Sequence, residues 1–128
     1  MKAKGAKGTR PKLPPVSEEM EQWSAMLGEE IRQWPKVSSR PMFGFQCFYR
    51  GKKIFAALPA TRGVGTLNTL MFRIKPMPAE LLERAKQEPR IETESRTPGA
   101  KWFLFELSSS EDLRDVLWWL NQAYERAK

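Results

Sequence analysis

Residues 40–58, RPMFGFQCFYRGKKIFAAL, decide the fold of this chain. Their two apolar halves, 42–50 and 53–58, are rich in aromatic and small apolar residues, and the aromatic half in particular is typical of a β-strand. Gly51-Lys52 stands between them, and a two-residue loop with glycine first is typical of a type II′ turn. Pro59 ends the second half, so the stretch predicts a β-hairpin.

The first strand of this hairpin carries aromatic side chains at both odd and even positions. Alternation would place one set on one face, namely Phe43, Phe45, Cys47 and Tyr49. It would place the other set on the opposite face, namely Met42, Gly44, Gln46, Phe48 and Arg50. We therefore expect a strand that is covered on both sides.

The rest of the chain predicts three helices and three further strands around this hairpin. A helix is expected from the capping residue Ser17 to Trp34, because Pro35 stops it. Strands are expected at 69–75, 91–96 and 101–107, a short helix opens at Pro78, and a last helix follows Ser109. The prediction is an α+β domain with one antiparallel sheet of about five strands and three helices, in the order α-β-β-β-α-β-β-α.

Composition weighs against most catalytic chemistry. The 128 residues contain no His, which removes the usual general base and the usual metal ligand. The one cysteine, Cys47, lies mid-strand among aromatic residues and is expected to be a buried, inert side chain. Gly63-Val64-Gly65 precedes a strand rather than a helix, so we interpret it as a hairpin loop and not a phosphate loop. The sequence predicts no enzyme, no metal and no cofactor.

The net charge of +7 is concentrated at the start of the chain. Residues 1–12 hold five basic side chains and no acid, which leaves +2 for residues 13–128. We expect residues 1–16 to form a disordered basic arm and residues 17–128 to form a single domain. The arm is either a solubilising tail or a weak electrostatic contact to a polyanion.

No apolar run is long enough to span a membrane and no secretory signal is present, so a cytoplasmic location is expected.

Two groups of residues are candidates for binding. The first is a set of cations on the hairpin turn and on the following strand, namely Arg50, Lys52, Lys53, Arg73 and Lys75. A basic β-ribbon of this kind can contact nucleic-acid phosphates, although the tip of a solvated turn is also commonly polar. The second is the adjacent pair Trp118 and Trp119, which point about 100° apart on a helix. One of them is expected at the margin of the core or at an interface, with a homodimer contact as the hypothesis.

Parts of the hairpin resemble the N-terminal domain of the TfoX family. The resemblance rests on Met42-Phe43-Gly44, Tyr49, Gly51-Lys52 and Phe55-Ala56, and it extends in element order over residues 17–126, including the Trp102-Phe103 strand. Related MmcQ/YjbR-like proteins are similar in kind. Phe45 replaces the second glycine of the family pattern, and residues 60–67 make a longer loop.

The resemblance implies a small bacterial α+β domain without enzyme activity, linked to regulation of DNA-uptake competence or to DNA binding. We therefore expect a binding or regulatory module that contacts a protein partner or, weakly, nucleic acid. The alternative is a protein–protein interaction domain, homodimeric through Trp118 or Trp119, with no role in nucleic-acid binding.

Overall fold

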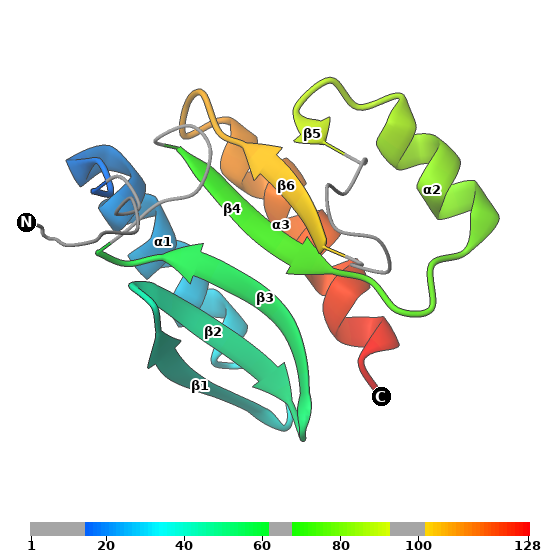
Figure 1. Ribbon diagram of the computed structural model, residues 1–128, viewed down its shortest axis with the longest axis horizontal. Coiled ribbons are helices and arrows are strands. Elements are labelled where there is room, and N and C mark those ends of the chain that lie inside the picture. Colours follow the sequence, from blue (N-terminus) through cyan, green and yellow to red (C-terminus); the bar gives the residue numbers. More distant parts are fainter. Residues whose placement is uncertain (1–14, 62–67, 93–101) are drawn as a thin grey trace, which may run out of the picture.

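The computed structural model describes residues 15–61, 68–92 and 102–128, and these contain three helices and six strands (Figure 1). The elements in chain order are α1 (Glu18–Ile31), β1 (Val37–Met42), β2 (Phe45–Arg50), β3 (Lys53–Pro59), β4 (Thr69–Arg73), α2 (Ala79–Lys86), β5 (Ile91–Glu92), β6 (Trp102–Glu106) and α3 (Asp112–Arg126). All the strands join one antiparallel sheet in the order β1-β2-β3-β4-β6-β5. The predicted α+β class is thereby confirmed.

The sheet has six strands where about five were predicted, because β1 was not anticipated. The observed order is α-β-β-β-β-α-β-β-α, with β1 at one edge of the sheet. Its sequence, VSSRPM, has few apolar residues, and most of its side chains are exposed. Proline is tolerated on an edge strand because its position need not donate a ladder hydrogen bond. An edge strand of this kind lacks the alternation by which a strand is recognised in sequence.

The two turns at the start of the sheet have different backbone conformations. Gly51 has φ of +61°, and Arg50 pairs with Lys53, so the predicted two-residue loop is confirmed. The turn from β1 to β2 is Phe43-Gly44, in which both residues have positive φ, +54° and +86°. That pair of values defines a type I′ turn. Residues 42–44 therefore lie at and just beyond the end of β1 rather than in the strand expected at 42–50.

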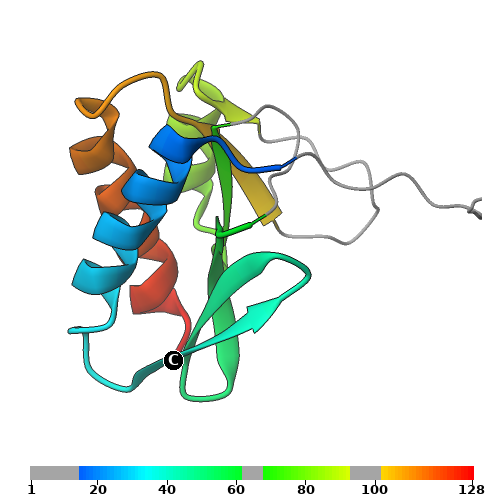
Figure 2. The ribbon, with the colours of Figure 1, turned by 90° about the vertical axis from the view of Figure 1, so that its left-hand side faces the viewer.

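A single large core lies between the sheet and the helices. Figure 2 shows α1 and α3 on the same side of the sheet. The Ser17 hydroxyl accepts a hydrogen bond from the Met20 amide at 3.0 Å and so caps α1, as predicted. The α1 helix ends at Ile31, three residues before the predicted Trp34, yet the Trp34 ring still packs 5.1 Å from that of Tyr124. The buried side chains of α1 and α3 meet those of β3, β4 and β6, while α2 adds Leu81 and Ala85.

Candidate nucleic-acid interface

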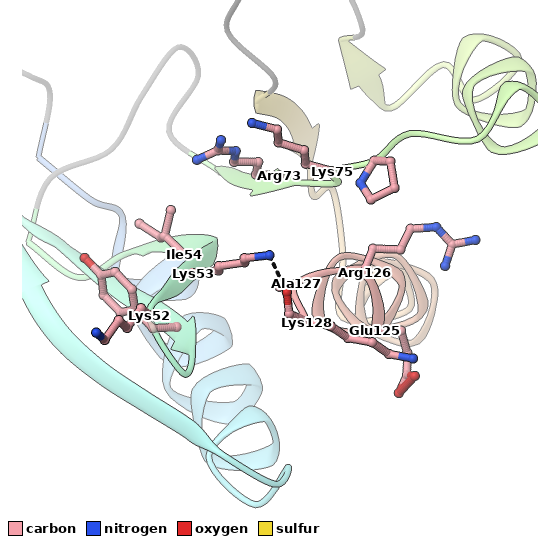
Figure 3. A pocket seen from close by; sticks show the side chains of 11 residues that line it. Lys52, Lys53, Ile54, Arg73, Lys75, Glu125, Arg126, Ala127 and Lys128 are labelled. Atoms are coloured by element: carbon pink, nitrogen blue, oxygen red, sulfur yellow. Dashed lines mark hydrogen bonds between the residues drawn. The ribbon is translucent and has the colours of Figure 1, made fainter.

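A basic hollow opens where β3 and β4 diverge. The two strands pair only at Ala56↔Phe72 and Ala57↔Met71, so residues 53–55 and 73–75 spread apart. The hollow between them measures about 770 Å³, and the end of α3 closes one side of it (Figure 3). Its lining comprises Tyr49, Lys52, Lys53, Ile54, Arg73, Lys75, Pro76, Glu125, Arg126, Ala127 and Lys128. We name this site the basic notch; six of its side chains are cationic and one, Glu125, is acidic.

Two of the cations at this end of the sheet are bound to backbone carbonyl groups at the end of α3 or just beyond it. The Arg50 guanidinium donates to the Tyr124 carbonyl at 3.0 Å and lies 4.4 Å from the centre of the Tyr124 ring. The Lys53 ammonium donates to the carbonyl oxygen of Lys128. A helix C-terminus carries partial negative charge, which would repel an incoming anion. The Arg50 contact offsets that charge at the helix end.

Four other cations in the notch have no such partner. Within the described ranges, no hydrogen bond or ion pair engages the side chain of Lys52, Arg73, Lys75 or Arg126. Figure 3 shows Arg73 and Lys75 on the β4 side, with Lys52 near β3 and Arg126 at the end of α3. Cationic groups that outnumber the acids around a hollow produce a positive potential there. We call these four the unpaired cations.

The structure brings together most of the cations that the sequence singled out. Lys52, Lys53, Arg73 and Lys75 all line the notch, whereas Arg50 does not and instead binds the end of α3. Sequence reasoning missed Arg126 and Lys128. Both occupy the last turn of a helix or just follow it, where a cation is ordinarily explained by the helix dipole. That Arg126 and Lys128 also line the notch follows only from the position of α3 beside the diverging strands.

The two adjacent tryptophans have different environments. Trp119 is 3% exposed and stacks on Phe72 with ring centres 5.9 Å apart, so it belongs to the core and offers no surface to a partner. Trp118 is 37% exposed, and the Arg84 guanidinium lies 4.2 Å from its ring centre. Consecutive residues of a helix point about 100° apart, which is why one ring is buried and the other is exposed. Of the predicted interface pair, only Trp118 remains available.

Cys47 occupies the centre of β2 and is 5% exposed. Burial raises the pKa of its thiol, and the nearby Arg40 only partly opposes this effect. A thiol with a raised pKa is protonated at neutral pH and is a poor nucleophile. The position of Cys47 therefore agrees with the structural role expected for it. The glycine-rich segment 63–65 lies outside the described residues.

Three carboxylates converge on Arg90, the densest charge cluster in the described ranges. The guanidinium binds Glu88 at 2.7 Å, Asp112 at 2.8 Å and Asp115 at 3.0 Å. Hydrogen bonding to Arg90 lowers the pKa of Glu88. Hydrogen bonds from the Ser108 and Ser109 amides, and then one from the Arg90 guanidinium, lower the pKa of Asp112. Arg90 satisfies these carboxylates, so the cluster is an ion-pair network that links β5 to α3. Nowhere in the described ranges do acidic or cysteine side chains gather as metal ligands would.

Comparisons of this chain with protein-family models, with curated proteins and with solved structures find no match. Within the described ranges, no helix has both the length and the apolar character needed to cross a membrane.

Proposed function

We propose that this domain is a non-enzymatic binding module that holds the phosphate backbone of nucleic acid in the basic notch. One observation carries the proposal: the four unpaired cations, contributed by the β2–β3 turn, by β4 and the residues after it, and by α3, surround one hollow that has a single acidic side chain. Phosphate contacts of this kind position a protein on nucleic acid without reading its sequence.

The shape of the site supports this ligand class. Lys52 lies on a two-residue turn, so its side chain can reach a backbone that runs past the hairpin. Arg73 and Arg126 present planar guanidinium groups, which suit bidentate contact with phosphate. The resemblance of the hairpin to TfoX N-terminal domains also supports a regulatory binding module in the cytoplasm.

Charge reversal tests the proposal. We expect Lys52→Glu combined with Arg73→Glu to weaken binding of a fluorescent DNA duplex at least about tenfold, because two attractive contacts become repulsive. Lys86→Glu is the matched control, since this exposed lysine at the end of α2 lies outside the notch lining. Fluorescence anisotropy at fixed salt measures all three proteins. Equal weakening in the control, or none in the double variant, would reject the notch as the binding site.

A second candidate function is a protein contact through Trp118. The observation that favours it is a tryptophan that remains 37% exposed on α3 beside Arg84, since aromatic and arginine side chains are enriched at protein interfaces. The simplest partner is a second copy of the chain. Light scattering over a range of concentrations tests this, with Trp118→Ala as the variant. A mass that stays monomeric at every concentration would exclude the homodimer.

A further inference from the structure

The sheet has a second apolar face on the side away from the core. The described helices contribute their buried side chains to the core on one face, and Figure 2 shows α1 and α3 together on that side. An antiparallel sheet covered on one side usually alternates apolar inward and polar outward residues. Here the opposite face holds a separate cluster of Phe45, Cys47 and Ala57, with Tyr49, Ile54, Met71 and Trp102 packed against it.

This second face is continuous with the basic notch. Tyr49 and Ile54 belong both to the apolar cluster and to the notch lining. Arg73, one of the unpaired cations, pairs across the sheet with Trp102. At the other side of the cluster, the Arg40 guanidinium lies 4.9 Å from the centre of the Tyr49 ring. Half-buried aromatic rings are therefore flanked by guanidinium groups from β1 and β4.

We propose that this face is a platform for single-stranded nucleic acid, on which bases stack at Tyr49 and Trp102 while the backbone runs along the notch. The inference rests on the proposed function and adds the class of strand that is bound. Aromatic rings and guanidinium planes are the surfaces on which unpaired bases stack in single-strand recognition. A duplex buries its base faces, so it can use only the phosphate contacts.

The geometry of the sheet gives the platform room for several nucleotides. Tyr49 lies on β2 and Trp102 on β6, with β3 and β4 between them. Three strand spacings correspond to about 14 Å. Among the described residues, the acids of this face are Glu92 and Glu106, and they lie on β5 and β6, beyond the cations of β1 and β4. A polyanion is therefore directed across β1 to β4, and Trp102 marks the limit of its path.

The charges also distinguish nucleic acid from a second copy of the chain as the occupant. Two copies that opposed β1 to β4 of this face would bring Arg40 and Arg73 of each close to like charges of the other. Like charges opposed across an interface are costly, whereas a phosphate backbone is complementary to them. Charge complementarity thus selects an anionic ligand that also offers flat apolar surface.

The test compares an oligothymidine strand with a duplex of equal length at one salt concentration. We expect the wild-type protein to bind the single strand more tightly. Tyr49→Leu and Trp102→Leu keep an apolar side chain but remove the flat ring, and each is expected to weaken single-strand binding at least about fivefold. Duplex binding is expected to stay unchanged in Trp102→Leu, because Trp102 lies outside the notch lining. The controls Tyr49→Phe and Trp102→Phe retain a ring and are expected to retain binding.

The outcomes separate the two proposals. Absence of binding to either nucleic acid would defeat the proposed function. Duplex binding that equals or exceeds single-strand binding, or leucine variants that bind the single strand as wild type does, would overturn the platform and leave the notch intact. If a leucine variant does not fold, intrinsic tryptophan fluorescence provides the test instead. The single strand is expected to quench the emission of the wild-type protein, and this quenching is expected to be smaller in Trp102→Phe. An identical fluorescence change in Trp102→Phe would overturn stacking at this residue.

Discussion

Replacement of Arg90 by methionine removes the centre of the ion-pair network that joins β5 to α3. Methionine replaces with an apolar side chain the guanidinium that lies 5.0 Å from the centre of the Phe105 ring, while three carboxylates lose their common partner. The Arg90 side chain is 26% exposed, and those of Glu88 and Asp112 are 20% and 16% exposed. Charge-assisted hydrogen bonds at such half-buried positions contribute about 1 kcal/mol each after solvent screening.

Asp115 adds little to this sum. Its side chain is 56% exposed, and exposed ion pairs contribute only a few tenths of a kcal/mol. We therefore expect Arg90→Met to lower the free energy of unfolding by about 2 kcal/mol at pH 7, which shifts the urea midpoint by about 1 M. Arg114→Met is the matched control, because this arginine of α3 is exposed and outside the network. It is expected to change stability by less than about 0.5 kcal/mol.

The pH dependence of the Arg90 effect gives a second check. A carboxyl group whose pKa is lowered by folding stabilises the fold above its unfolded pKa, and this stabilisation is lost as the pH falls through the lowered value. The pKa values of Glu88 and Asp112 are lowered. Asp112 keeps its hydrogen bonds from the Ser108 and Ser109 amides in the variant, so Glu88 carries most of the pH-dependent part.

The difference in stability between wild type and Arg90→Met is therefore expected to be full at pH 7 and to shrink below about pH 4. Urea unfolding followed by circular dichroism across this range measures it. A loss below about 0.5 kcal/mol at pH 7, or a loss that stays constant down to about pH 2, would refute the reasoning.

Three further predictions concern the sheet and its turns. Phe43→Asn is expected to raise the free energy of unfolding by about 1 kcal/mol, because asparagine tolerates the φ of +54°. Little packing is lost, since the phenylalanine side chain is 82% exposed. Urea titration measures the change, and a lower midpoint would contradict the prediction. Gly51→Ala is expected to cost about 1 kcal/mol through its φ of +61° alone, since a Cβ there meets nothing within 4 Å; unchanged stability would contradict the strain. Cys47 is expected to resist alkylation in the native protein and to react in urea, and fast native modification would show that the thiol is accessible.

The hairpin was predictable because its signals are local. Gly51 supplies the conformation that the turn requires, and aromatic residues on both sides favour strands. The strand β1 was not predictable from the same signals, since an exposed edge strand with Pro41 has little apolar periodicity. Phe43 was assigned to a strand face because an exposed phenylalanine with positive φ contradicts ordinary residue preferences.

The candidate site was predictable only in part, for a different reason. Lys52, Arg73 and Lys75 could be grouped because they lie on a turn and a strand that were expected to be neighbours. The contribution of Arg126 depends on where α3 ends relative to β3 and β4, and that position follows from core packing rather than from local sequence. The divergence of β3 from β4, which creates the hollow, likewise has no local signature.

The salt dependence of duplex binding tests the central claim, that the unpaired cations of the notch bind phosphates. Each phosphate contact contributes about −0.9 to the slope of log affinity against log salt, so four contribute about −3.6, roughly a hundredfold in affinity between about 50 and 200 mM salt. We predict that replacing Lys52, Arg73, Lys75 and Arg126 together by glutamine makes the slope less negative by about this amount. An unchanged slope in the quadruple variant would contradict the account.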